Sequence, residues 1–528
     1  MKNPLFLRAI SLPLLLHFAL SSCDSSSNDA RDSAEESSLH GLPEHARYVH
    51  EDAWAIITLR PEQFLQKMNY RRFIRSPLFS QMGKDAKAVF EILGLEAPER
   101  TGLDLEKPVF IFMRGDPDGQ DFQLEATFAI SDVSAFRNFV DNAIALMELQ
   151  DMEGISQSTD GGTHVIQFEA GLLSFDKGKA LVQAGPGRIV NRFDSPGDIG
   201  KLSPKLRQHL MASFDLAYVV NFPKFLNIMP RRGPEAEMLR MFESLGMELA
   251  GYEISGEKGS LVLRSFNDFV DGDVDYDIFG KDVDGALLSV IPENSIAGAS
   301  LSLNLQTILS KWLPIFANMT GDPSFPRNGD EVIPDLELSF NDLAGAFTGQ
   351  VAGAFVNMPA PGDRNEVPEF VIAVQTANPT SNIYRRVIAN RLLPLWKEHL
   401  SKEAKADGVE LRTVGDLIII ASSGQLPTLG NGSAYNPVSG EKRAILKNGF
   451  GGVWFDPNRL LRAMPIDRGT PNSEQASLLR FAEGIDLVSM KTERKDEKFS
   501  ATMEISFRDK SLNGWSHVTR MIERIGAF

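Results

Sequence analysis

MELAGYEISGEKGSLVLRSFND, residues 247–268, is the stretch that decides the fold class of this chain. Apolar and polar residues alternate on both sides of a Gly-Glu-Lys-Gly turn, which predicts two β-strands joined as a hairpin. A second stretch of this kind, IDLVSMKTERKDEKFSATMEISFRD, occupies residues 485–509. Both stretches contain Ser-Phe-x-Asp at their ends, and the two endings lie 241 residues apart. The sequence therefore predicts long antiparallel hairpins that occur twice in one chain.

Segments upstream of the two hairpins match each other in the same order. FDLAYVVNFPKFLNIMP ends at Pro230 and GFGGVWFDPNRLLRAMP ends at Pro465. Each predicts an apolar strand, a turn that carries a proline, and a short helix. Strand pairs match as well, and the second strand of each pair leads into a predicted helix. The matched strand segments are 107–115 with 349–359, 122–132 with 368–378, and 163–185 with 409–424, and the helices are Val133–Met147 and Thr380–Leu400.

The openings of the two copies also agree. Residues 42–68 and 291–312 each give an apolar-Pro turn, a β-prone stretch and an amphipathic helix. Strands outnumber helices and lie in hairpins, which predicts an α+β fold with antiparallel sheets rather than a parallel doubly wound sheet. We expect two tandem copies of one antiparallel-sheet-plus-helices module, residues 43–286 and 287–528. Strand-then-helix openings near residues 53, 215, 297 and 450 leave open whether each copy is itself two related halves.

The N-terminus has the three parts of an export signal. Lys2 and Arg8 are followed by an apolar run, Ala9 to Leu20. A helix needs roughly 20 residues to span a bilayer, so this run is too short to be a membrane anchor and is typical of a signal peptide. The run ends in Leu20-Ser21-Ser22-Cys23, which resembles the lipobox of bacterial lipoproteins. The resemblance implies that residues 1–22 are removed and that the thiol of Cys23 carries a diacylglyceryl group. The alternative is an ordinary signal peptide with a cysteine placed there by chance.

Cys23 is the only cysteine of the 528 residues. A disulfide, a zinc ribbon and a thiol nucleophile are therefore excluded, because each needs a thiol that lipidation does not use. Residues 23–42 continue with Ser, Asp, Glu and Asn and predict a flexible polar tether. The expected partner is thus a membrane, reached through the lipid on Cys23, in the bacterial cell envelope; the sequence does not choose between an inner and an outer membrane.

A loose family resemblance covers much of residues 43–528. The openings at Leu42-Pro43 and Ile291-Pro292, and the segment GLDLEKPVFIF (Gly102–Phe112), are similar to uncharacterised bacterial lipoproteins built from domains of unknown function. In these families, repeated strand-helix modules begin with "IP-x-x-A". The resemblance implies an α+β fold and a cell-envelope location, and it brings no active site.

Candidate chemical sites have simpler explanations. His40, His45 and His50 are spaced by five, which does not make ligands converge on one helix face, so we expect surface histidines. The acidic junction 268–284 lacks the Gly and Glu of a calcium-binding EF-hand loop and favours a solvated linker, with a looser calcium site left open. Three Ser-x-x-Lys sequences lack the companion motifs of the serine enzymes that use them. Neither a metal nor a cofactor is therefore expected.

The formal net charge of −16 disfavours nucleic acid as a partner, because an acidic surface repels phosphates. Arg71, Arg72 and Arg75 are interpreted as the solvent face of a helix rather than as a basic patch. We expect a non-enzymatic envelope lipoprotein that acts as a scaffold or binding protein, with an envelope protein as a further partner. The alternatives are a carrier or sensor that holds lipid or peptide in an apolar groove between the copies, and a degenerate hydrolase.

Overall fold

The computed structural model describes residues 42–75, 97–117, 119–146, 155–168, 170–187, 189–197, 199–229, 243, 246–269, 280–314, 317, 326–333, 336–357, 368–399, 409–422, 436–463, 482–495 and 498–525. Leu20, Ser21, Ser22, Cys23, His40 and the tether up to Gly41 lie outside these residues. So does the centre of the acidic junction, residues 270–279.

The chain forms two compact units. The first unit consists of residues 27–270 together with 509–528, and the second consists of residues 271–508. The last 20 residues therefore pack with the N-terminal part of the chain. The predicted copies 43–286 and 287–528 rest on sequence similarity alone and stay a prediction.

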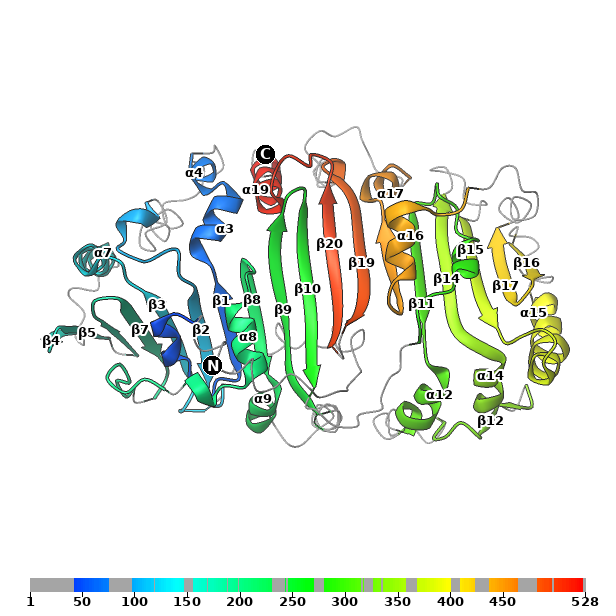
Figure 1. Cartoon of the computed structure of the whole chain (residues 1–528), viewed down its shortest axis with the longest axis horizontal. Helices are drawn as coiled ribbons and strands as arrows, with labels where there is room; N and C mark the ends of the chain where they lie inside the picture. The colour runs from blue at the N-terminus through cyan, green and yellow to red at the C-terminus, as the bar shows by residue number, and fades with distance from the viewer. Residues whose placement is uncertain are drawn as a thin grey trace. The chain divides into compact units, whose positions relative to one another are not determined.

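The first unit is built on one antiparallel sheet (Figure 1). Its strand order is β4-β5-β6-β7-β3-β2-β1-β8-β9-β10. The strands are β1 (Ala55–Leu59), β2 (Val109–Arg114), β3 (Gln123–Ala129), β4 (Ser156–Asp160), β5 (Thr163–Phe168), β6 (Gly171–Phe175), β7 (Lys179–Ala184), β8 (Leu216–Asn221), β9 (Met247–Glu257) and β10 (Ser260–Phe269). The helical segments are η1 (Glu44–Tyr48), α3 (Pro61–Met68), α4 (Tyr70–Phe73), η2 (Pro98–Arg100), α7 (Val133–Leu146), η4 (Ile199–Lys201), α8 (Pro204–Met211), α9 (Phe222–Ile228) and α19 (Gly514–Ile525).

The second unit has a sheet of the same kind, in the order β16-β17-β15-β14-β11-β18-β19-β20. These strands are β11 (Ala297–Ser302), β14 (Phe347–Asn357), β15 (Glu369–Thr376), β16 (Val409–Val414), β17 (Leu417–Ser422), β18 (Gly451–Phe455), β19 (Ile485–Lys495) and β20 (Lys498–Phe507), and a separate small pair is β12 (Val332–Ile333) with β13 (Leu338–Ser339). The helical segments are α11 (Gly285–Leu288), α12 (Leu305–Thr307), the π-helix η5 (Ile308–Trp312), α14 (Phe340–Ala346), the π-helix η6 (Tyr384–Leu392), α15 (Leu393–His399), α16 (Gly440–Lys447) and α17 (Pro457–Ala463).

The predicted fold class is confirmed, because both units combine helices with antiparallel strands. Both predicted hairpins form, and in the first of them Ser260 pairs with Glu257 across the turn. Gly259 adopts φ +80°, a conformation that side chains with a Cβ rarely reach, so the glycine of the predicted turn is needed there. In each unit the first strand lies between two strands that come later in the chain: β1 between β2 and β8, and β11 between β14 and β18.

One face of each sheet is covered by helices. In the first unit, η1 and α8 pack on Ile56, Phe110, Phe112 and Val219 of the central strands. In the second unit, α11 and α16 pack on Ala352, Ala373, Trp454 and their neighbours. We call these surfaces the covered faces. Glycine allows this packing in the second unit, because a Cβ on Gly298 would lie 2.8 Å from the Trp454 indole.

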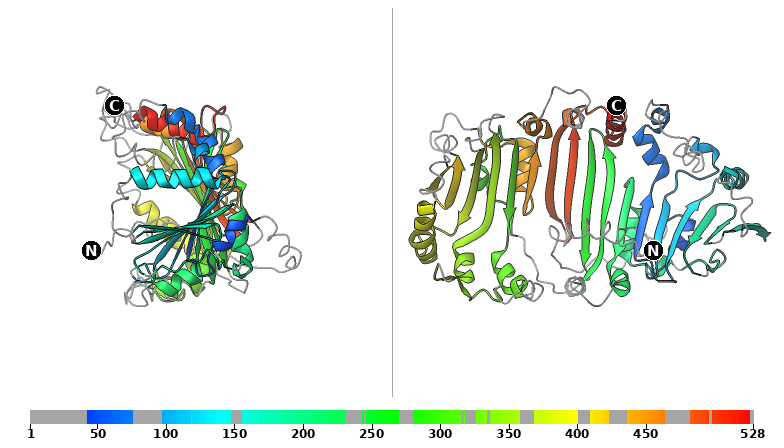
Figure 2. Two further views of the ribbon diagram at one scale, coloured as in Figure 1. Left: turned by 90° about the vertical axis from the view of Figure 1, so that its left-hand side faces the viewer. Right: turned by 180° about the vertical axis from the view of Figure 1, so that it is seen from behind.

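The C-terminal helix is part of the first unit. Helix α19 contacts α3 and the strands β9 and β10. The right-hand view of Figure 2 shows the red helix α19 beside the blue helix α3. Ser516 and Thr519 donate hydrogen bonds to the carbonyl oxygens of Lys67 and Met68 at the end of α3. The last helix of the chain therefore caps the first helix that follows β1.

Candidate functional site

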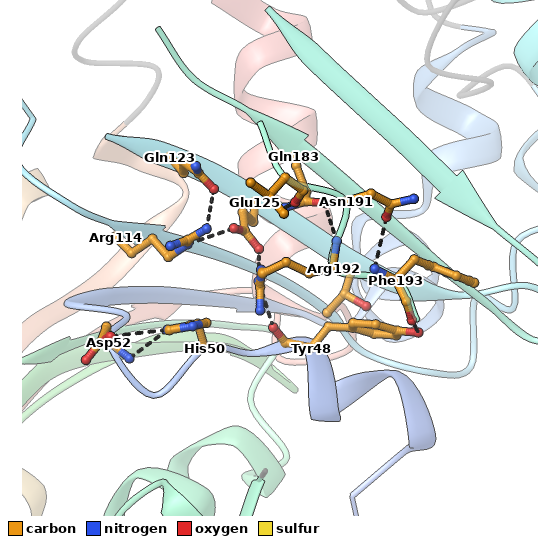
Figure 3. Close-up of polar contacts among 12 residues, drawn as sticks. Tyr48, His50, Asp52, Arg114, Gln123, Glu125, Gln183, Asn191, Arg192 and Phe193 are labelled. Atoms are coloured by element: carbon orange, nitrogen blue, oxygen red, sulfur yellow. Dashed lines mark hydrogen bonds and ion pairs between the residues drawn. The ribbon is translucent and has the colours of Figure 1, made fainter. Parts of the chain in front are cut away.

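A buried carboxylate, Glu125, lies on the covered face of the first unit (Figure 3). It is fully buried and pairs in register with Phe112 of β2. Arg114 donates from Nε to Glu125 Oε1 at 2.8 Å, and Arg192 donates to the other carboxylate oxygen. Because both oxygens are paired with guanidinium groups, the negative charge is neutralised inside the protein.

The surroundings of Glu125 hold Arg192 in place. Gln183, on the neighbouring strand β7, accepts from the Arg192 backbone N–H and donates to the Val190 carbonyl. Tyr48 donates its hydroxyl hydrogen to the Phe193 carbonyl at 2.8 Å, and its ring stacks on Phe193. These contacts fix the loop that carries Arg192 and thereby position the guanidinium over the sheet.

His50 and Asp52 lie at the edge of this cluster (Figure 3). Burial, together with Arg192 and Arg114 nearby, lowers the pKa of His50. Asp52 accepts a hydrogen bond from Lys224 Nζ at 2.8 Å, and this bond lowers the pKa of Asp52. His50 is therefore neutral at pH 7 and receives the backbone N–H of Asp52 at Nδ1.

A second buried cluster is formed by His209 of α8. Its Nδ1 lies 2.9 Å from Glu253 Oε1, and its Nε2 lies 3.2 Å from Asp268 Oδ2. The imidazole also stacks on the Phe266 ring at 3.8 Å. Burial alone would lower the pKa of His209, but the two carboxylates raise it. Both ring nitrogens face carboxylate oxygens, which only accept hydrogen bonds, so these contacts favour the doubly protonated ring and join α8 to β9 and β10.

The third cluster surrounds Asp215, which is fully buried. Its Oδ2 accepts from the Gly256 backbone N–H at 2.7 Å and from the Trp515 indole at 2.8 Å, and Lys67 Nζ lies 2.8 Å from Oδ1. Asn513 donates to the Gly256 carbonyl at 2.7 Å. Asp215 thus connects β8, the hairpin β9–β10, α3 and the C-terminal helix.

Within each of the three clusters, groups of opposite charge pair with one another. A histidine that acts as a general base needs one ring nitrogen free for a substrate proton, and both nitrogens of His209 are occupied. Glu125 and Asp215 have no charge left for a substrate, because each is paired with cationic groups. Their geometry is that of internal supports, in which charged groups hold separate elements together.

The expectation of surface histidines is wrong for His45. Residues Glu44–Tyr48 form η1, which turns His45 inward until only 2 % of it is exposed. Its Nε2 lies 2.8 Å from the Pro108 carbonyl, and its ring contacts Phe110. Spacing along the chain gave no sign of this, because the turn after Pro43 has no helical period. Arg71 and Arg72, in contrast, are exposed on α4, as predicted.

None of the three clusters was predicted from the sequence. The alternation in FQLEATFAISD pointed the other way, since Glu125 shares its side of β3 with the polar Gln123 and Thr127, a pattern typical of a solvent-facing side. A buried acid at such a position requires a cation. Its partner Arg192 lies in a loop without a pattern, so the pair itself was not predictable. At the acidic junction, Asp268 contacts His209 and Asp284 caps α11, while residues 270–279 lie outside the described part.

The opposite face of the second sheet is apolar and half-exposed. Register pairs place Leu301, Val351 and Val374 in one row and Val453, Met490 and Met503 in another, with all six side chains on the side away from α11 and α16. Ile372 is 42 % exposed and Val453 is 39 % exposed. We call this surface the open face. At one end, η6, α15 and α14 pack over Ile418 of β17. Among the other described residues of the face, Leu301 and Met503 are also more than a third exposed, whereas Val488 and Ala501 are buried.

The first unit has an open face of the same kind. It includes Ile57, Ile111 and Ile254, and α7 packs over its end at Phe128 and Val182. At its centre, Tyr218 of β8 lies directly opposite Tyr252 of β9. Burial raises the pKa of each phenol to about 12, which marks a surface of low polarity.

A hollow of about 630 Å³ also lies in the first unit, between α3, α4 and η2. Charges of both signs line it: Glu62 and Glu99 face Arg71 and Arg75, beside the apolar Ile74. Its mixed lining selects no ligand class. Within the described ranges, no cluster of three or more His, Cys, Asp or Glu side chains is placed to hold a metal. No helix in those ranges is both long and apolar enough to cross a membrane.

No protein-family model and no curated protein matches this chain. Among solved structures, crystal form IV of a protein named TP0453 is similar at 12 % identity with a TM-score of 0.27, over 43 % of this chain and 81 % of that one. Crystal form I of TP0453 is similar at 10 % identity with a TM-score of 0.24, over 73 % and 96 % of the two chains. Similarity at this level assigns neither a family nor a function.

Proposed function

We propose that this protein is a bacterial cell-envelope lipoprotein, anchored through lipid on Cys23, whose body is a non-enzymatic binding protein. The observation that carries the anchor is the position of the only cysteine, directly after Leu20-Ser21-Ser22 and a 12-residue apolar run. Two or three acyl chains at about 0.8 kcal/mol per buried CH₂ hold a protein stably on a bilayer, whereas one chain does not. The proposed partner is therefore a membrane, and the loose resemblance to uncharacterised lipoproteins agrees with this.

The described body supports binding rather than catalysis in two ways. The buried charges of Glu125, His209 and Asp215 are each used within the fold. Large apolar side chains such as Ile372 and Val453 stay half-exposed on an open sheet face, and surfaces of this kind mark interaction sites.

The anchor is tested by replacing Cys23 with serine in the full chain. Wild-type protein should incorporate labelled fatty acid and stay with membranes after washing with high salt and carbonate, whereas Cys23→Ser should do neither. Ser22→Ala is the matched control, because alanine keeps the small residue of the lipobox and should leave labelling unchanged. An unlabelled wild-type protein, together with a Cys23→Ser variant that still resists the washes, would disprove the anchor.

A further inference from the structure

The open face of the second unit has the size of a lipid-binding surface. Six strands, β15-β14-β11-β18-β19-β20, contribute to it, and strands at a spacing of about 4.8 Å make it about 24 Å wide. The hydrocarbon of one bilayer leaflet is about 15 Å thick, half of the roughly 30 Å core. An acyl chain laid across these strands would therefore contact the sheet over its whole length.

The chemistry of the open face favours an apolar ligand without hydrogen-bonding groups. Apart from Thr376, whose hydroxyl donates to the Asp416 carbonyl, the register-paired positions that share this face in β11, β14, β15 and β18 are Ala, Gly, Val, Leu, Ile and Phe. In β19 and β20, the paired positions between 488–492 and 501–505 add methionine and one hydroxyl, that of Thr492. Thr492 donates to the Gly451 carbonyl and is therefore already used.

An extended peptide fits this surface poorly. The backbone N–H and C=O groups of the inner strands are paired with neighbouring strands, and none of the face positions named above carries a charge. A peptide backbone laid on the face would lose its hydrogen bonds to water without gaining others, which costs free energy. Acyl chains have no such groups, so they bury apolar surface on both sides at no polar cost.

The proposed anchor identifies the source of such chains. The 18 residues from Asp24 to Gly41 separate Cys23 from the described body and span at most about 60 Å. A body held within that distance of a bilayer meets phospholipid at a high local concentration. We propose that the open face of the second unit binds the acyl chains of membrane phospholipids, an inference that rests on the proposed anchor for the source of its ligand.

The inference is tested with the purified full chain carrying Cys23→Ser, which lacks its own lipid. The protein is mixed with vesicles of phosphatidylethanolamine and phosphatidylglycerol, separated from them, and assayed for bound lipid phosphorus. cis-Parinaric acid fluorescence gives the affinity for a single acyl chain. We expect saturable uptake of phospholipid and saturable binding of the fatty acid.

Val453→Glu places a charge in the centre of the open face and should weaken binding at least tenfold. Val332→Glu is the matched control, since it makes the same change at a valine that is 59 % exposed on the small pair β12–β13. It should leave binding within twofold of the parent. Ile372→Gln adds a milder polar change at an exposed position, and circular dichroism and thermal melting show that each variant is folded.

Four results would overturn the inference. Folded Cys23→Ser protein that takes up no lipid, or binding that Val453→Glu and Val332→Glu reduce equally, would exclude the open face as the site. Binding of an amphipathic helical peptide, without lipid uptake, would identify a different class of ligand. Fatty-acid binding by Cys23→Ser but not by lipidated wild type freed of phospholipid would mean that the chain's own anchor occupies the face. These readouts use purified protein, so they stay distinct from the fractionation that tests the anchor.

Discussion

The carboxylate of Asp215 accepts a hydrogen bond from the indole of Trp515, which lies 300 residues further along the chain. The bond is 2.8 Å long, and its acceptor is fully buried. The Trp515 ring also meets the Phe64 ring edge-on at 5.0 Å. Through these contacts the last helix of the chain is fixed to the unit formed by residues 27–270.

Trp515→Phe removes the indole donor and keeps most of the ring. Because the lost bond has a buried carboxylate as acceptor, we expect the free energy of unfolding to fall by about 1.5–3 kcal/mol. Equilibrium denaturation in urea measures the change. Trp54→Phe is the control: its indole donates to the neutral Gly115 carbonyl, so it should cost about 1 kcal/mol in hydrogen bonding. Equal losses in the two variants would contradict the proposed role of Asp215.

Arg192→Met leaves Glu125 with one guanidinium partner in a fully buried position. Breaking a buried ion pair from one side costs about 3–5 kcal/mol, and the remaining Arg114 should place this variant near the lower end. Glu125 and Arg192 contact each other directly, so the double variant Glu125→Gln with Arg192→Met should lose less stability than the sum of the two single variants, by at least about 1 kcal/mol. Denaturation of the three variants measures this coupling, and losses that simply add would show that the ion pair is not the cause.

His209 should make stability depend on pH. Its pKa is raised in the folded protein by Asp268 and Glu253, against the effect of burial, so its contribution is fully present below the unfolded value of about 6.5. That contribution is lost as the pH rises through the raised folded pKa. The stability difference between wild type and His209→Gln should therefore be largest near pH 6 and shrink toward alkaline pH. A stability difference between wild type and His209→Gln that stays constant from pH 6 to pH 9 would contradict this role of the ring.

Gly298→Ala tests the packing of the covered face in the second unit. The new Cβ would lie 2.8 Å from the Trp454 indole, and overpacking of this kind costs about 1–3 kcal/mol. Gly171→Ala, in another strand, meets its nearest atom only at 3.4 Å and should change the free energy of unfolding by less than about 1 kcal/mol. Thermal unfolding of the two variants measures the difference. A smaller effect at Gly298 than at Gly171 would contradict this packing.

Local patterns predicted the elements well. The alternation around Gly-Glu-Lys-Gly gave the hairpin β9–β10, and the apolar spacing after Asp132 gave α7 over Val133–Leu146. In both places the information lies within neighbouring residues, because a turn and a helical period are local properties. The same holds for α3, whose proline at its first turn and apolar stripe are visible in the sequence.

Long-range pairing was not predictable in this way. Nothing in the alternation of β1 specifies that β2 lies on one side and β8 on the other. The partner of Glu125 lies in a loop, and the helix that carries Trp515 belongs by sequence to the second copy. The open faces were not predictable for a related reason. Alternating apolar residues show which side of a strand is apolar, but they do not show whether a helix covers that side.

The Asp215–Trp515 contact also determines when the first unit can complete its folding during synthesis. A ribosome adds about 5–20 residues per second, so the indole follows its acceptor by about 15–60 s. During that interval residues 27–270 exist without the helix that caps α3. We expect a chain truncated after Arg508 to be cleaved by protease within residues 246–269 far faster than the complete chain. The unit that is synthesised first is therefore completed last. A chaperone that binds its incomplete form must stay bound until the final 20 residues have been made.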